Sequence, residues 1–401
     1  MRATTARLLA ATACIGLWLL TSAAYAQQSP YKITGKCGDL PKVDLHTPEG
    51  YCVGLAATGL KFPRGLLPLS DGRLLVSEMI GWGSPNGRID VLTPDGQGHY
   101  VKKELARHLD QPHGLALGPD GKVYVGVVGG VKRFDLADPA TIEDVIGGKS
   151  GVQGPPGNGR HPLESLLFTK AGTLLVNVGS QTDNCEDDAG NPAKGDQLCP
   201  ETIAANPHAQ VREYSFDWAS GRATGWRVFA DGLRNSMGLA QYPSSGLILQ
   251  AENSRDSIDQ VMPGLANDED LPPDEINILE AGGHYGWPYC YGADIPSPEY
   301  AHWDCSKYRA PLVELPAHAA PLGMAYWHDG LVLSFHGYRS HGHRVVWFPV
   351  DETGKPSGPF QELIFGWEKP QGAPVDVRPG PDGALYIAED HNGTILRLLA
   401  E

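Results

Sequence analysis

His161 is the leading candidate for proton-transfer chemistry in this sequence, because it stands directly before an apolar stretch, HPLESLLF. An imidazole near its ordinary pKa accepts a proton at neutral pH and returns it. Taken alone, one histidine of 14 is more often a structural hydrogen-bonding group. Five further histidines compete for the same role: His113, His318, His336, His341 and His343.

A second cluster combines arginines with oxygen-rich side chains. Arg234 and Asn235 precede one apolar stretch, and ENSRD at 252–256 follows it. Guanidinium groups beside carbonyl and side-chain oxygens are suited to holding a polycarboxylate together with a hard cation such as calcium. The alternative interpretation of this cluster is a surface ion-pair network.

Two further segments carry chemistry-bearing residues. The acidic and aromatic run at 270–288 is either an ordered loop beside the site or decoration of the scaffold. The segment FHGYRSHGHR at 335–344 is either a transition-metal site or a flexible, glycine-rich rim loop.

The elements that must position these residues come from one repeated pattern: an apolar strand, a turn near Asp-Gly, and a second apolar strand. FPRGLLPLSDGRLLVSE at 62–78 and PVDVRPGPDGALYIAED at 374–390 are its first and last copies. Six copies predict an all-β fold, a six-bladed β-propeller of four-stranded antiparallel blades, rather than a solenoid. The six turn glycines are Gly72, Gly121, Gly172, Gly246, Gly330 and Gly383.

In a propeller the two strands of each copy are the innermost strands of a blade. Residues before the first strand and after the second therefore share one face, which we call the site face, while the turns lie on the other. Function commonly sits on loops held by such a rigid scaffold. The site face is expected to gather Arg64, Gln111, His113, His161, Arg234, Asn235, His318, Glu78, Ser180, Gln181, Glu252, Asn253, His336, Arg339, Glu389 and Asp390.

The first residues have the pattern of a secretory signal. Arg2 and Arg7 precede the apolar stretch 8–20, and Ala24-Tyr-Ala26 is a cleavage motif. The stretch is shorter than the roughly 20 residues of a spanning helix, which disfavours a membrane anchor. A lipoprotein signal at Cys14 is weaker still. We therefore expect a signal peptide at 1–26, a disulfide-stapled extension at 27–55 and a propeller at 56–401, in a periplasmic or secreted protein.

Cysteines and charge limit the partners. Six cysteines beyond the predicted signal form three local pairs, Cys37 with Cys52, Cys185 with Cys199, and Cys290 with Cys305, which predicts disulfides in an exported chain. The sequence holds no C-x-x-C-H haem-attachment motif, so an electron acceptor would be a separate molecule. The formal net charge of −15 and the lack of a basic cluster disfavour nucleic acid.

Four segments in this order resemble the pyrroloquinoline quinone (PQQ) dependent sugar dehydrogenases, the family of soluble glucose dehydrogenase and the sorbosone dehydrogenases. They are GLRNSMGLA at 232–240, ENSRD at 252–256, LPPDEIN at 271–277 and GGHYGWP at 282–288. The resemblance covers essentially the whole mature chain. It implies a calcium- and PQQ-dependent enzyme that oxidises a sugar and passes electrons to a separate cytochrome or quinone.

The resemblance also implies roles for individual residues. His161 matches the family's general base, and Gln111 is the nearest match to an assisting glutamine, with His113 as the alternative. Arg234 and Asn235 match the pair that contacts the cofactor. The carbonyls of Asn253 and Ser254 match the calcium ligands. His336 and Arg339 lie where glucose-oxidising members have a lysine that binds the cofactor.

The sequence departs from the glucose-oxidising members elsewhere. Ala373 and Val375 replace a pair of arginines, and Arg160 replaces an acid before the base. These differences favour a substrate nearer to sorbosone than to glucose. Two rival functions stay open: a calcium-dependent lactonase built on Glu78, Asn253 and Asp390, and a non-catalytic sugar- or protein-binding propeller.

Overall fold

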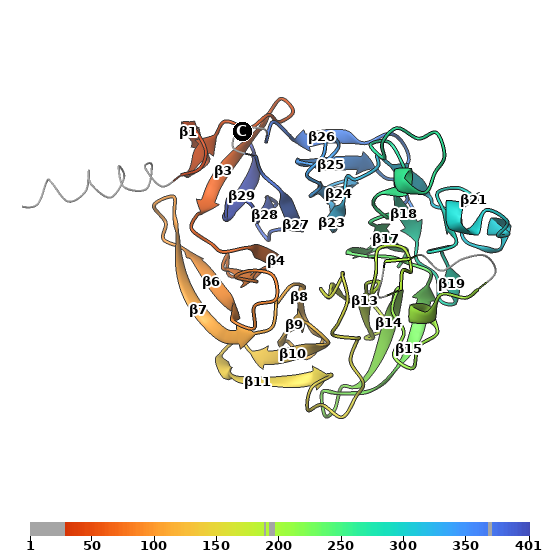
Figure 1. The fold of residues 1–401 in the computed structure, drawn as a ribbon. Helices are drawn as coiled ribbons and strands as arrows, with labels where there is room; N and C mark the ends of the chain where they lie inside the picture. Colours follow the sequence, from red (N-terminus) through yellow and green to blue (C-terminus); the bar gives the residue numbers. More distant parts are fainter. Residues whose placement is uncertain (1–28, 188–189, 192–196, 368–370) are drawn as a thin grey trace, which may run out of the picture.

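The computed structural model describes residues 29–187, 190–191, 197–367 and 371–401, and the predicted signal peptide at 1–26 lies outside them. The described residues form seven sheets, and the six larger sheets are arranged around a common axis (Figure 1). Neighbouring strands in these six sheets run antiparallel, apart from one short parallel pairing in the third blade. The predicted six-bladed β-propeller is confirmed. Among the described residues, no helix has the length and apolar character needed to cross a membrane.

Each repeated pattern forms the first two strands of one blade, as predicted. Blade one contains β4 (Pro63–Pro68), β5 (Leu74–Glu78), β6 (Gly87–Pro94) and β7 (Tyr100–Leu109). Blade two contains β8 (Leu115–Leu117), β9 (Val123–Val127), β10 (Gly130–Asp135) and β11 (Asp138–Ile146). Blade three contains β12 (Leu166–Phe168), β13 (Leu174–Val178), β14 (Gln210–Asp217) and β15 (Arg222–Asp231), and β19 (Gly283–His284) is added to its sheet. Blade four contains β16 (Gly238–Gln241), β17 (Ile248–Glu252), β18 (Asp274–Ile278) and β22 (Val313–Leu315). Blade five contains β23 (Pro321–Trp327), β24 (Gly330–Phe335), β25 (Arg344–Pro349) and β26 (Gln361–Ile364). Blade six contains β27 (Pro374–Pro379), β28 (Leu385–Glu389), β29 (Thr394–Ala400) and β3 (Tyr51–Ala57).

The inner strands close the ring. β4 contacts β8, β8 contacts β12, and the contacts continue through β16, β23 and β27 back to β4. The second strands, such as β5 and β9, are buried along their whole length, because neighbouring blades cover both of their faces. The outermost strand β7 is largely exposed. This gradient explains why the inner strands are nearly continuous apolar runs in the sequence.

The turn glycines behave largely as the pattern predicts. Gly72, Gly121, Gly172, Gly246 and Gly383 all have positive φ, which glycine adopts without steric cost. Gly330 is needed for a different reason, because a Cβ there would lie 1.9 Å from Trp347 Nε1.

The sixth blade is completed by residues from the start of the described chain. β3 pairs antiparallel with β29, with Leu55 opposite Leu396, so the two ends of the propeller are joined by a sheet. β1 (Ile33–Cys37) and β2 (Leu40–Val43) extend this sheet outward, and the disulfide Cys37–Cys52 ties β1 to β3. The domain boundary at residue 56 stays a prediction, although β3 begins at Tyr51.

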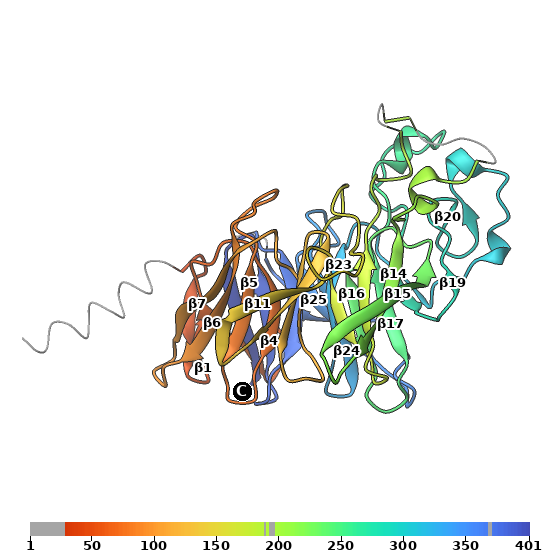
Figure 2. The ribbon, with the colours of Figure 1, turned by 90° about the horizontal axis from the view of Figure 1, so that it is seen from below.

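Two insertions rise from one side of the site face (Figure 2). They span 182–208, between β13 and β14, and 279–312, between β18 and β22, and the second carries β20 (Cys290–Tyr291) and β21 (Ile295–Pro296). The disulfides Cys185–Cys199 and Cys290–Cys305 pack together with aromatic rings in one small core. All three predicted disulfides are confirmed.

Ring closure by β3 has a measurable consequence for stability. Leu55 is 0% exposed and packs in the core between the fifth and sixth blades. Leu55→Ala should therefore lower the free energy of unfolding by about 2–5 kcal/mol. The matched control is Val101→Ala in β7, where the side chain is 60% exposed and the expected change is within about 0.5 kcal/mol. Equal midpoints of urea denaturation for the two variants would contradict this role of β3.

Candidate functional site

His161 is held in a defined tautomer by the loop that follows β13. Its Nδ1 lies 2.9 Å from Ser180 Oγ and 3.2 Å from the Ser180 carbonyl. The carbonyl can only accept a hydrogen bond, and the single hydroxyl proton of Ser180 is donated to the Thr182 carbonyl at 2.6 Å. The proton of neutral His161 is therefore on Nδ1, which leaves Nε2 with a free lone pair.

The environment of His161 keeps the imidazole neutral. Burial and the nearby Arg234 guanidinium lower the pKa of His161 well below 6.5, and Arg160 adds to this effect. A depressed pKa means that the unprotonated form persists as the pH falls, until the pH reaches the lowered pKa. His161 is therefore a free base at neutral pH, as a proton acceptor must be.

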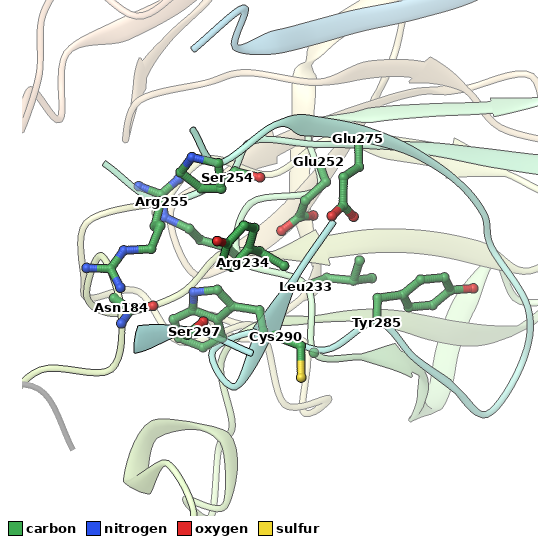
Figure 3. Close-up of a pocket in the computed structure, with 14 residues that line it drawn as sticks. Asn184, Leu233, Arg234, Glu252, Ser254, Arg255, Glu275, Tyr285, Cys290 and Ser297 are labelled. Atoms are coloured by element: carbon green, nitrogen blue, oxygen red, sulfur yellow. The ribbon is translucent and has the colours of Figure 1, made fainter. Parts of the chain in front are cut away.

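Arg234 is buried between the loops that follow β13 in the third blade and β17 in the fourth blade, which we call the exit loops of these blades. Only 4% of its side chain is exposed. Its Nε donates to the Asp183 carbonyl at 3.0 Å, one terminal nitrogen donates to the Asn253 carbonyl at 3.0 Å, and the other pairs with the Asp183 carboxylate. Figure 3 shows Arg234 between Asn184 on one side and Glu252 on the other. Three of the five guanidinium N–H groups are thus used, and two have no assigned bond.

Asn235 carries an unsatisfied acceptor beside this arginine. Its Oδ1 is buried and has no hydrogen-bond partner among the described residues. Its backbone N–H is fixed by Glu252 at 3.1 Å. Buried polar atoms are rarely left unpaired in folded proteins, so an orphaned oxygen here indicates that a donor or cation completes its bonding.

Asn253 and Ser254, in the loop that follows β17, are fixed by hydrogen bonds that their own N–H groups donate. Asn253 Nδ2 donates to the Pro321 carbonyl at 2.7 Å, and the Ser254 N–H donates to Asp274 Oδ1 at 2.8 Å. The Asn253 carbonyl already accepts from Arg234, but a carbonyl has two lone pairs and can also coordinate a cation. Carbonyl oxygens of this kind are ordinary calcium ligands.

Behind these residues the fourth blade holds buried carboxyl groups. Burial raises the pKa of Asp274 to about 6, of Glu252 to about 7 and of Glu275 to about 8. Glu252 and Glu275 lie side by side in Figure 3. The cavity that they line with Arg234 and Asn184 is only about 20 Å³, whereas sites for organic ligands measure about 300–1,000 Å³. This cavity is therefore part of the support for Arg234 and not a substrate pocket.

A second charged cluster lies on the site face, on the opposite side from Arg234. Arg64 pairs with Asp390 at 2.5 Å and lies 3.4 Å from His113 Nε2, and His336 Nε2 lies 3.2 Å from Asp390. Arg64 Nε and His113 Nδ1 are buried without a partner among the described residues. The cluster joins blades one, two, five and six.

The remaining predicted residues have specific neighbours of their own. Gln111 Oε1 accepts from the Gly83 N–H at 2.8 Å and thereby holds the loop after β5. Arg339 forms a bidentate pair with Asp268 at 2.6 and 3.2 Å. The structure thus brings His161 near Arg234, whereas His336 contacts Asp390 and Arg339 pairs with Asp268. The roles of all these residues stay predictions.

A family model described as TrAA12-like matches residues 45–301. The chain belongs to the TrAA12-like family. This confirms the predicted relationship to PQQ-dependent sugar dehydrogenases, since a relative from Hypocrea jecorina, a "pyrroloquinoline quinone-dependent sugar dehydrogenase", is 26% identical over 363 residues, 78% of this chain and 76% of the relative.

Other proteins are also similar to this TrAA12-like protein. A "pyrroloquinoline quinone-dependent pyranose dehydrogenase" from Coprinopsis cinerea is 23% identical over 373 residues, 82% of this chain. The chain spans about half of the length of that relative, 48%, and likewise 49% of an uncharacterized protein from Borreliella burgdorferi that is 26% identical over 43% of this chain. The calcium structure of the Trichoderma reesei family AA12 enzyme has a TM-score of 0.73 at 23% identity and covers 91% of this chain and 99% of that one. That likeness establishes the shared fold.

Sequence reasoning missed the residue that anchors Arg234 in this TrAA12-like protein. Asp183 lies in an insertion outside the repeated pattern, and the nearest predicted feature is the disulfide cysteine Cys185, two residues later. Ser180 was expected on the site face, but its link to His161 depends on a hydroxyl direction that the sequence does not give.

The tautomer and protonation of His161 can be measured directly. In protein carrying ¹⁵N-labelled histidine, we expect Nδ1 of His161 to be protonated and Nε2 unprotonated at neutral pH. The ring should titrate at a pH below 6.5, because burial and Arg234 disfavour the imidazolium. The His161→Gln variant assigns the signal by its disappearance. An Nε2–H tautomer, or titration above pH 6.5, would show that this account of the site is wrong.

Proposed function

We propose that this protein is an exported, calcium- and PQQ-dependent dehydrogenase that oxidises a sugar hydroxyl or a hydrated sugar aldehyde. The observation that carries the proposal is a neutral His161 with a free Nε2 beside a buried arginine, within a fold of the TrAA12-like family. The named activities of the Hypocrea and Coprinopsis relatives support the same chemistry.

The residues present fit the cofactor and its cation. Arg234 and Asn235 would hold PQQ, Arg234 through the two N–H groups without an assigned bond and Asn235 through its orphaned Oδ1. The carbonyls of Asn253 and Ser254 would hold calcium. When bound, PQQ with calcium supplies an electrophilic acceptor for the hydrogen and electron pair that leave the sugar carbon.

The protein itself handles the proton of the reaction. His161 Nε2 accepts the proton of the sugar hydroxyl as the carbon–hydrogen bond breaks, so the sugar loses two electrons and two hydrogens in total. The positive charge that forms on the ring is shared with the Ser180 carbonyl and hydroxyl, which accept from Nδ1–H. Because Arg234 opposes a second positive charge nearby, His161 readily releases this proton again.

The identity of the sugar is proposed only as a class. We place the substrate among aldoses and sorbosone-like aldehydes, since Arg160 and Val375 depart from the pattern of the glucose-oxidising members. Electrons leave to a separate acceptor, a cytochrome or a quinone. The chain is placed in the periplasm or outside the cell, after cleavage near residue 26.

Titration of the purified apoprotein tests this proposal. PQQ added in the presence of calcium should bind saturably and confer dye reduction with one or more sugars of a panel of aldoses and sugar aldehydes. Chelation of calcium before PQQ is added should abolish this activity. Failure to bind PQQ would overturn the proposal, and hydrolysis of sugar lactones without PQQ would favour the lactonase alternative.

Replacement of the base separates chemistry from cofactor binding. His161→Gln should lower kcat by about 10²- to 10⁴-fold, the usual contribution of general-base catalysis, while PQQ affinity stays near that of the wild type. The matched control is His328→Gln, which changes an exposed histidine on the opposite face of the propeller and should leave kcat unchanged. Full activity of His161→Gln would exclude His161 as the base.

A further inference from the structure

We propose that Asp183 is a positioning residue that fixes both the Arg234 guanidinium and the loop carrying the cation-binding carbonyls. The inference rests on the proposed function, because it concerns the way in which this chain prepares its site for PQQ and calcium. Asp183 lies after β13, in the first insertion, and is 6% exposed.

Asp183 contacts Arg234 through two different groups. Its carboxylate pairs with one terminal guanidinium nitrogen, and its main-chain carbonyl accepts from Nε at 3.0 Å. These two contacts, with the bond from the guanidinium to the Asn253 carbonyl, fix the plane of the group. A fixed plane also fixes the direction of the two remaining N–H groups, which is what binding a planar anionic ligand requires.

The same carboxylate also anchors the exit loop of the fourth blade. Both oxygens of Asp183 lie 3.2–3.3 Å from the Asp256 backbone nitrogen. Asn253 and Ser254, whose carbonyls we assign to calcium, lie three and two residues, respectively, before Asp256. One side chain from the third blade therefore sets the position of the arginine and of the carbonyls together.

Asp183 is itself held by a stapled loop. Its N–H donates to Glu186 Oε2 at 3.0 Å, and the disulfide Cys185–Cys199 closes the loop two residues later. Thr182 Oγ1 donates to the buried Glu201 at 2.6 Å. The Asp183 carbonyl also lies 3.4 Å from Trp287 Nε1, in the second insertion. The two insertions, each closed by its own disulfide, thus hold Asp183 in position.

Charge balance explains why an aspartate is present. A buried guanidinium without a counter-ion is strongly unfavourable, and removal of one partner of such a pair leaves the other uncompensated. Among the described residues, the other carboxylate within 4 Å of the Arg234 guanidinium is Asp256, whose oxygen lies 3.7 Å away and whose side chain is 42% exposed. Asp183 is therefore the main counter-ion of Arg234 among the described residues.

The test is a double-mutant cycle on PQQ affinity, measured by titration of apoprotein with PQQ and calcium. Asp183→Asn should weaken PQQ binding by about 10- to 100-fold, the usual effect of losing a partner that orients a ligating group. In an Arg234→Gln background, the same change should have a smaller further effect, because the guanidinium that Asp183 positions is absent and only its contact with the Asp256 N–H is lost. Asp294→Asn, at an exposed aspartate of the second insertion, is the matched control and should bind PQQ as the wild type does.

The outcomes separate this inference from the proposed function. If wild-type protein binds PQQ and Asp183→Asn binds it equally well, the positioning role is overturned while the proposed function stands. An equal loss in the Arg234→Gln background would also overturn the inference that Asp183 positions both groups, because Asp183 would then act through the exit loop alone. Absence of PQQ binding by the wild type would overturn the proposed function and this inference with it.

Thermal unfolding of the apoproteins shows whether each variant folds. If Asp183→Asn does not fold, Asp183→Glu serves in its place, since it keeps the charge but displaces the carboxylate. We expect Asp183→Glu to fold and to bind PQQ more weakly than the Asp294→Asn control. Wild-type affinity in Asp183→Glu would overturn the inference.

Discussion

A guanidinium buried between two propeller blades sets the main constraint on this site. Arg234 carries a charge with 4% of its side chain exposed, so its hydrogen bonds and counter-ion must come from the protein. They come from Asp183 and from the carbonyl of Asn253. Because Arg234 also lowers the pKa of His161, one buried charge links the proposed cofactor site to the protonation state of the proposed base.

The propeller provides the rigidity that this arrangement needs. Asn253 directly follows β17, and His161 and Arg234 stand five and four residues before β12 and β16, so buried inner strands hold the loops that carry all three residues. The pairing of β3 with β29 closes the ring and joins the first and last blades. Two insertions, each closed by its own disulfide, then support the buried charge of Arg234.

Much of this organisation could be predicted from the sequence, because the strand pattern and the turn glycines recur six times. The site face and the three disulfides followed from the same pattern and from local cysteine spacing. The contribution of β3 to the sixth blade was not predicted, since β3 precedes the first copy of the pattern. Hydrogen-bond directions at Ser180 and Asp183 were likewise beyond the sequence, as they depend on how two loops from different blades meet.

The structure also bears on the rival functions. Glu78 accepts from the Lys61 N–H and pairs with Arg88 and Lys102, so its carboxylate is tied to its own blade. Asp390 is paired with Arg64 and His336. Both carboxylates are thus already paired with basic side chains, which disfavours the metal site that the lactonase interpretation requires. Turnover of a sugar by protein loaded with PQQ and calcium would exclude the non-catalytic propeller.

The most direct test of the central claim is the reduction of protein-bound PQQ by a sugar in a single turnover. Protein loaded with PQQ and calcium would be mixed without oxygen or acceptor with an aldose or sugar aldehyde, and the absorbance of the cofactor followed in a stopped-flow instrument. We predict reduction that depends on sugar concentration and is slower when the oxidised carbon carries deuterium. Bound PQQ that stays oxidised with every sugar of the panel would contradict the proposed dehydrogenase.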